Sequence, residues 1–197
     1  RGQMVSLSGF YKQFLNPIEI VQFATTQKTQ VQPRNVGDGE VYGVEFEFRQ
    51  GLSFLGNRFE NFSINSNFTY TYSEIELTQT EYESRQLNAR VGETVGKTRS
   101  LAGLSPYVIN AGLLYNGSAD EGVWHNLQAG LFYNVQGETL TIVGMASKPD
   151  IYTLPFHSLN FTLNKQFNGI GLGIKISNIL NNKSEKVYQA YKAHAEK

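Results

Sequence analysis

Residues 61–73 read Asn-Phe-Ser-Ile-Asn-Ser-Asn-Phe-Thr-Tyr-Thr-Tyr-Ser, and this stretch sets a side-chain period that most later segments of the chain repeat. Apolar and aromatic residues occupy its even positions, broken only by Ser66, whereas the odd positions carry Ser, Asn and Thr. Successive side chains of a β-strand point to opposite faces, so the stretch predicts a strand with one apolar face and one neutral, hydrogen-bonding face. Two kinds of protein use such strands: a soluble sandwich with the apolar face inward, and a transmembrane barrel with that face outward.

Six other segments alternate in the same way, which predicts about seven strands in all. The strands are expected near residues 5–13, 42–49, 62–77, 107–116, 127–136, 158–164 and 170–177, with apolar spacing resuming briefly at Ile18 and Ile20. The sequence Asn168-Gly169 between the last two is a strong hairpin signal. The residues after 181 are polar and predict no further strand.

The connections between these strands alternate in length. Long polar connections are expected at about 24–40, 78–105, 139–155 and after 181, and short ones at 54–60, 117–123 and 168–169. Outer-membrane barrels place short turns on the periplasmic side and long loops outside, so their connections must alternate in this manner. The order therefore favours the barrel over the sandwich.

Composition narrows the function classes. Seventeen basic and 17 acidic residues balance, without the clustered basic excess typical of nucleic-acid binding. The chain has no cysteine, which excludes disulfides and thiolate metal sites, and its three histidines lie too far apart in sequence for a metal-ligand motif. No apolar run approaches the roughly 18 residues of a transmembrane helix. The 11 Tyr and 13 Phe, beside many neutral polar residues, suit the aromatic girdles and polar lumen of a barrel.

The polar faces of the predicted strands supply candidate lumen residues. Glu45 and Glu47 lie two positions apart on one strand, so they are neighbours on a wet face rather than an acid/base pair. The sequence has no phosphate loop, nucleophile elbow or metal-ligand cluster, so neither an enzyme nor a cofactor is expected. The residues expected to face the lumen are Glu45, Glu47, Arg49, Asn134, Gln136 and Glu138.

The long connection at 78–105 is rich in charge. Arginine suits carboxylates because its guanidinium binds both oxygens, so this loop is a candidate site for an anionic ligand such as a ferric chelate. The alternatives are a solvated loop, or a loop that contacts lipopolysaccharide or a surface lipoprotein. The candidate ligand-binding residues are Tyr82, Arg85, Arg90 and Arg99.

Several short segments, taken in order, resemble a known family. The most characteristic is Gly-Val-Glu-Phe-Glu at residues 43–47. The others lie at residues 8–12, 16–19, 34–36, 67–73, 105–113, 133–137 and 176–181. Together they resemble the C-terminal barrel region of TonB-dependent outer-membrane receptors, most of all those of the Bacteroidota.

The resemblance implies an antiparallel transmembrane β-barrel of the 22-stranded class in a bacterial outer membrane. Residues 1–197 would form one partial barrel region of about seven strands, with the plug domain and the final strand absent. The intact receptor would import a nutrient such as a metal chelate, cofactor or oligosaccharide. Its partners would be membrane lipid, the rest of the barrel, the plug, the TonB energy-coupling complex and a surface lipoprotein.

The soluble or cell-surface sandwich, binding carbohydrate or protein, remains the alternative. The two hypotheses differ in where they place the apolar side chains of the strands. A barrel would turn them to lipid, whereas a sandwich would bury them in a dry core. The deciding residues, whose exposure distinguishes the two hypotheses, are Leu127, Leu131, Leu159, Phe161 and Ile174.

Overall fold

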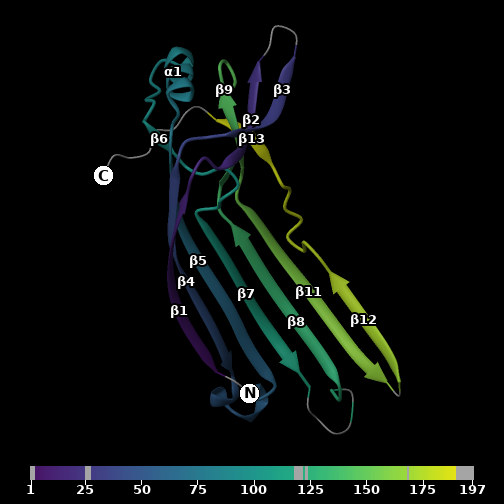
Figure 1. Ribbon diagram of the computed structural model, residues 1–197. Coiled ribbons are helices and arrows are strands. Elements are labelled where there is room, and N and C mark those ends of the chain that lie inside the picture. The colour runs from purple at the N-terminus through teal and green to yellow at the C-terminus, as the bar shows by residue number, and fades with distance from the viewer. Residues whose placement is uncertain (1–2, 25–27, 118–121, 123, 168, 190–197) are drawn as a thin grey trace.

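A long antiparallel sheet forms most of the computed structural model, which describes residues 3–24, 28–117, 122, 124–167 and 169–189 (Figure 1). Its strands follow one another in the order β1-β4-β5-β7-β8-β11-β12, and the two-residue β6 pairs with the end of β5. The bounds are β1 (Met4–Phe14), β4 (Gly39–Gly51), β5 (Phe62–Glu76), β6 (Thr98–Arg99), β7 (Tyr107–Asn116), β8 (Leu127–Gln136), β11 (Phe156–Phe167) and β12 (Ile170–Ile176). The predicted seven strands are therefore confirmed as consecutive neighbours in the long sheet.

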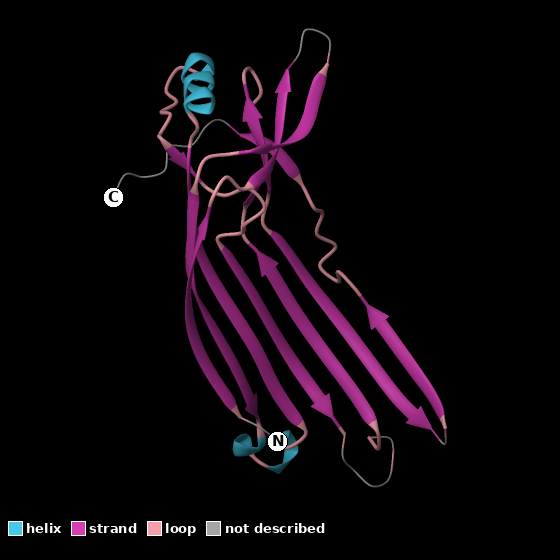
Figure 2. Ribbon diagram, viewed as in Figure 1, coloured by secondary structure: helices cyan, strands magenta, loops and turns pink. Residues whose placement is uncertain are grey.

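A second, shorter sheet lies beyond one end of the long sheet (Figure 1). Its order is β13-β10-β9-β2-β3, and it is antiparallel except where β2 pairs with β9. Its strands are β2 (Ile18–Ala24), β3 (Thr29–Asn35), β9 (Thr139–Met145), β10 (Asp150–Thr153) and β13 (Lys186–Gln189). The helix α1 (Gln79–Asn88) lies at this end, and the 3₁₀ turns η1 (Ser53–Leu55) and η2 (Asn57–Phe59) lie at the other (Figure 2).

The prediction that the long connections lack regular structure was wrong. The segments 24–40 and 139–155 and the stretch after 181 contain β3, β9, β10 and β13, and the segment 78–105 contains α1 and β6. Strand β9 is buried on both faces, at Leu140 and Val143 as well as Thr139 and Gly144, so its burial does not alternate. Pro33 sits in β3, an edge strand that tolerates a residue without an N–H donor.

The register of the long sheet separates an apolar face from a polar one. The first row of cross-strand partners runs through Ile64, Leu113, Leu131, Phe161 and Ile176. The second row, on the opposite face, runs through Glu47, Asn67, Asn110, Asn134 and Ser158. The alternation seen in residues 61–73 therefore extends across most of the sheet.

The residue Gly43 shows why the Gly-Val-Glu-Phe-Glu segment begins with glycine. The ring of Phe10 lies over Gly43 on the polar face, 2.7 Å from where an added Cβ would be, and that Cβ would also overlap the Tyr70 carbonyl oxygen. A larger residue would push apart β1, β4 and β5 at this point.

The apolar face is not covered by other parts of the described chain. None of the five deciding residues is buried, and the Leu131 and Ile174 side chains are 40% and 55% exposed. The buried apolar cluster lies instead in the short sheet, around Val21, Leu140 and Val143. This exposure contradicts the sandwich, which needed a dry core behind the long sheet.

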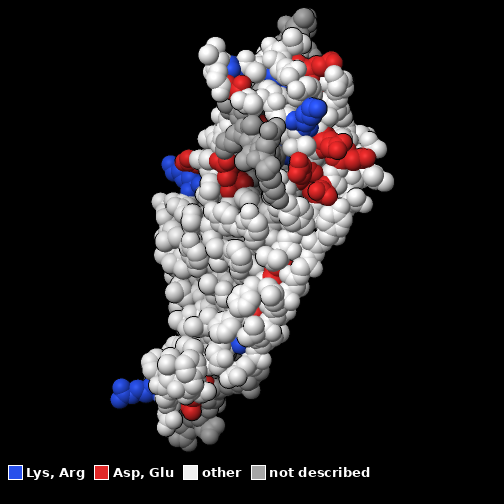
Figure 3. Space-filling model, turned by 90° about the vertical axis from the view of Figure 1, so that its left-hand side faces the viewer, with Lys and Arg blue, Asp and Glu red and all other residues white. Residues whose placement is uncertain are grey.

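Charged side chains are also distributed unevenly along the long sheet. In the view of Figure 3, charged side chains gather around the end that carries the short sheet and at the opposite tip, and the wall between them is almost uncharged. Among the described helices, none has the length and apolar character needed to cross a membrane.

Candidate functional site

The polar face of the long sheet carries a chain of asparagine side chains across three neighbouring strands. Asn110 donates from Nδ2 to Asn67 Oδ1 at 2.6 Å, and Asn134 donates in turn to Asn110 Oδ1. The Asn110 amide both donates and accepts, so the three side chains are linked without net charge. The result is a neutral, hydrogen-bonding track on one face of the wall.

The predicted lumen residues fall on or beside this polar face. Glu45, Glu47 and Arg49 share it with Asn134 and Gln136, as the strand register requires. The Glu47 and Arg49 side chains are about half exposed and 3.8 Å apart, so their ion pair contributes little stability. The sixth residue, Glu138, follows the end of β8 and lines a cavity instead.

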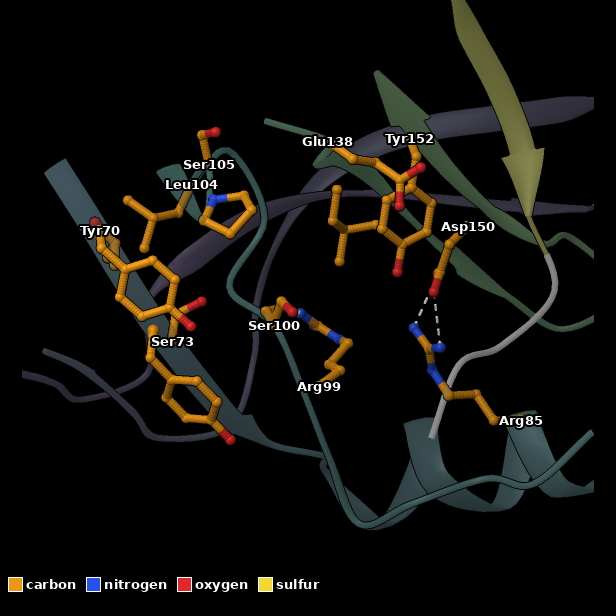
Figure 4. Close-up of a pocket in the computed structure, with 14 residues that line it drawn as sticks. Tyr70, Ser73, Arg85, Arg99, Ser100, Leu104, Ser105, Glu138, Asp150 and Tyr152 are labelled. Carbon is orange, nitrogen blue, oxygen red and sulfur yellow. Dashed lines mark hydrogen bonds and ion pairs between the residues drawn. The ribbon is translucent and has the colours of Figure 1, made fainter. Parts of the chain in front are cut away.

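That cavity, of about 320 Å³, lies where the end of β5 approaches the short sheet (Figure 4). The segment from Ser100 to Pro106 forms a further part of its wall, and Leu104 and Leu140 give it an apolar portion. The charged residues of the lining are Arg85, Arg99, Glu138 and Asp150, with the half-buried Tyr152 beside them.

A buried ion network forms one wall of the cavity and begins at Asp150. Both terminal nitrogens of Arg85 donate to the two oxygens of Asp150, each at 3.0 Å, in a bidentate pair. The Gly144 N–H also donates to Asp150, at 2.8 Å. An added Cβ at Gly144 would overlap the Lys148 carbonyl oxygen, so glycine is needed where β9 lies against the connection to β10. The pair with Asp150 joins α1 to β10, and within α1 Arg85 also donates from Nε to Glu81 at 3.0 Å.

Arg99 extends the network to β2. Its Nε donates to Glu81 Oε1 at 2.7 Å, and its Nη2 lies 2.7 Å from Glu19 Oε2 in an ion pair whose angle is poor for a hydrogen bond. The other oxygen of Glu19 accepts from the Ala102 N–H at 2.6 Å. Carboxylates and guanidiniums thus alternate from Asp150 to Glu19, and the network ties α1, β6, β10 and β2 together.

All five charged groups of the network are 5% exposed or less. Burial by itself lowers the pKa of Arg85, but the charges of Asp150 and Glu81 outweigh it and raise that pKa above its ordinary value. The pKa of Arg99 is likewise raised, because Glu81 and Glu19 outweigh its burial. Both guanidiniums therefore stay charged. Ion pairs, rather than contact with solvent, stabilise the charges of the network.

The structure brings only two of the four candidate ligand-binding residues together. Arg85 and Arg99 meet in the network, where each of their nitrogens contacts a carboxylate or a carbonyl. Tyr82 is half-buried and its hydroxyl accepts from Gln86, while Arg90 is exposed; neither lines the cavity. The prediction of an anion site from these four residues stays untested.

Sequence reasoning missed Glu19, Glu81, Asp150 and Tyr152. For Glu81 a signal was present: Thr78 accepts from the Glu81 N–H as the helix N-cap, and Glu81 precedes Arg85 by one helical turn. The partners Glu19 and Asp150 are far away in sequence, and Asp150 also lies in a segment that gave no strand signal.

The Tyr152 hydroxyl predicts a pH dependence of stability. Burial, and then the charge of Asp150, raises the pKa of Tyr152 from near 10 to about 12. The unfolded chain ionises this group first, so its contribution is complete below pH 10 and is lost as the pH rises toward 12, by at most about 2–3 kcal/mol. Denaturant unfolding of wild type and Tyr152→Phe between pH 9 and 12 should show a steeper loss in wild type. Parallel curves would mean that Tyr152 ionises normally.

Comparison with known proteins gives one match. Residues 1–179 match the family model described as TonB dependent receptor-like, beta-barrel. No curated protein and no solved structure matches the chain.

Proposed function

The chain belongs to the TonB-dependent receptor-like β-barrel family, whose members are outer-membrane transport proteins, and from this premise we propose that it forms part of the wall of a nutrient-importing receptor. The observation that carries the proposal is the uncovered apolar face of the long sheet, which backs onto a polar face of Asn, Ser, Thr and Glu. A bilayer is the surrounding that such a face requires, because a monomeric protein in water rarely exposes a large contiguous apolar patch.

The edges of the long sheet support a larger barrel. Within the described residues, β1 pairs only with β4 and β12 only with β11, so each has one edge of backbone donors and acceptors without a strand partner. Hydrocarbon does not tolerate such edges, since no water is present to bond them. We expect further strands of the same receptor to close the barrel, in the 22-stranded class of plugged transporters.

The polar face then lines the lumen. Glu45, Glu47 and Arg49 would contact the plug domain, and the asparagine row would offer neutral hydrogen bonds beside it. The plug would transmit the energy of the inner-membrane TonB complex, and the barrel wall would stay rigid. The short sheet and α1 would lie on the outer side, where a surface lipoprotein is a candidate partner. The resemblance of the Gly-Val-Glu-Phe-Glu and other segments supports a source among the Bacteroidota.

Deletion of the gene, combined with membrane fractionation, tests this proposal. We expect the protein in the outer-membrane fraction, and loss of growth on one limiting nutrient among metal chelates, cofactors and oligosaccharides. Uptake should return with the wild-type gene and disappear again when the inner-membrane energy complex is inactivated. A protein found in the soluble fraction, or uptake that ignores the energy complex, would overturn the proposal.

A further inference from the structure

The short sheet lies on the same side of the wall as the polar face of the long sheet. Ala102 packs against the buried cluster of the short sheet, and the neighbouring Leu101 N–H donates to Ser73 Oγ at 3.1 Å. Ser73 belongs to the odd-numbered residues of β5, which lie on the polar face. Asp150 and Tyr152 of the short sheet line the cavity across from Ser73 (Figure 4). One face of the short sheet is therefore turned toward the wall, and its other face is turned away from it.

The face that is turned away carries an apolar row that crosses all five strands. The strand register places one residue of each strand side by side on this face. Val21 of β2 and Val143 of β9 are partners on the covered face, so the residue before each of them lies on the open face. The row is roughly 20 Å across, since neighbouring strands lie about 4.8 Å apart. From β13 to β3 it consists of Tyr188, Ile151, Ile142, Ile20 and Pro33.

This open face is exposed and almost uncharged. Tyr188 is 67% and Ile20 42% exposed. Ile18 and Val31 lie on the same face, at 68% and 55% exposure. Among the described strand residues of this face, Lys186 is the one that carries a charge. The short sheet thus covers its carboxylates and exposes its apolar side chains, which is the reverse of a sheet that faces water.

The shape and composition of the open face suit a protein surface better than a small molecule. A small molecule needs a concave site that surrounds it, whereas the row runs along the surface of a sheet. Permanent protein interfaces are more apolar than transient ones and are depleted of charge at their centre. In a closed barrel, the side of the wall that bears the polar face is the lumen, and barrels of the 22-stranded class hold a plug there. Further strands of the wall would instead join at β1 and β12, which are the edges of the long sheet.

We propose that the open face of the short sheet is a docking surface for the outer end of the plug domain, and that the plug segment seated on it is apolar and uncharged. This inference rests on the proposed function, because it requires a closed barrel around a plug. The ion network ties β2 and β10 to α1 and β6, and β6 pairs with β5 of the wall. The plug would therefore meet a surface that is fixed to the wall.

A photoreactive benzoyl-phenylalanine in place of Ile20 or Tyr188 identifies what covers this face. The intact receptor is irradiated in whole cells, and its peptides are analysed by mass spectrometry. We expect both positions to cross-link to a plug peptide of the same polypeptide. Leu87 is the control position, because it is 86% exposed on α1, and it should give no plug peptide. Cross-links from Ile20 and Tyr188 to lipid, to another polypeptide, to a second copy or to other barrel segments would overturn the inference, as would their absence.

Ile20→Asp and Tyr188→Asp place a carboxylate in the expected interface and test its effect on the plug. A loosened plug opens the lumen, so cells with either variant should become severalfold more sensitive to vancomycin, which the intact outer membrane excludes. Leu87→Asp adds the same group outside the interface and should leave the sensitivity unchanged. Heat-dependent gel migration of isolated membranes checks that the strains contain equal amounts of folded receptor. Wild-type sensitivity in both variants at equal amounts would contradict the docking surface.

The two proposals fail in different ways. A receptor that lies in the outer membrane and imports its nutrient, but gives no plug cross-link, would refute the docking surface alone. A protein found in the soluble fraction would refute the transport function, and the docking surface with it.

Discussion

Replacing Arg99 by alanine is expected to release β6 and the segment 98–102 from β2 of the short sheet, whereas α1 keeps its pair with β10 through Arg85 and Asp150. Arg99 lies between Glu81 and Glu19, and its removal leaves Glu19 without its ion-pair partner at 5% exposure. Removing one partner of a buried pair costs about 3–5 kcal/mol, because the remaining charge stays desolvated and uncompensated. Glu81 keeps Arg85, so the loss should be largest where the segment 98–102 meets β2.

Hydrogen exchange followed by mass spectrometry measures this release directly. In Arg99→Ala, the amides of residues 98–102 should exchange much faster than in wild type, while those of β7 and β8 stay protected. Arg90→Ala is the control, because Arg90 lies in the same segment but is exposed. Arg99→Lys should be intermediate, since lysine keeps the charge but lacks the planar fork that reaches two carboxylates. Unchanged protection of residues 98–102 in Arg99→Ala would show that Arg99 does not hold this segment against β2.

The long sheet was predictable from the sequence because each of its strands has one apolar face and one polar face. A strand such as β5 alternates Phe62, Ile64, Phe68 and Tyr70 with neutral polar residues, and period two is visible in the sequence without knowledge of any partner. The register follows from the same alternation, since a slip by one residue would turn the apolar set to the polar face. The order of short and long connections then predicted how the strands follow one another.

The short sheet and the ion network were not predictable for the opposite reason. Strand β9 is covered on both sides, and the alternation of its sequence, Thr-Leu-Thr-Ile-Val-Gly-Met, ends after four residues, too short a run to predict a strand. The arginines at 85 and 99 looked like free cations because their partners come from distant segments: Asp150 lies 65 residues beyond Arg85. Only the pair Glu81 and Arg85 is local. Contacts of this kind depend on tertiary structure, which local patterns do not encode.

The opposite faces of β8 give the second large prediction. Leu131 is 40% exposed and lies in the apolar row, between Leu113 of β7 and Phe161 of β11. If this row faces lipid, Leu131→Arg places a guanidinium in hydrocarbon, at a cost of about 2–4 kcal/mol near the bilayer midplane. We expect little or no folded receptor in the outer membrane of cells that carry this variant, measured by the heat-dependent gel migration of isolated membranes.

Gln128→Arg adds the same group to the same strand on the polar face, where Gln128 is exposed and pairs with Asn116 and Asn164. A water-filled lumen accepts that charge, so this variant should assemble at close to the wild-type level. Assembly of both variants would place the apolar row outside the hydrocarbon region, and failure of both would point to a general sensitivity of β8 to bulk. A wall with lipid on one side and water on the other predicts that Leu131→Arg fails to assemble and that Gln128→Arg assembles normally. No other outcome fits it, because the two changes differ only in the face that receives the charge.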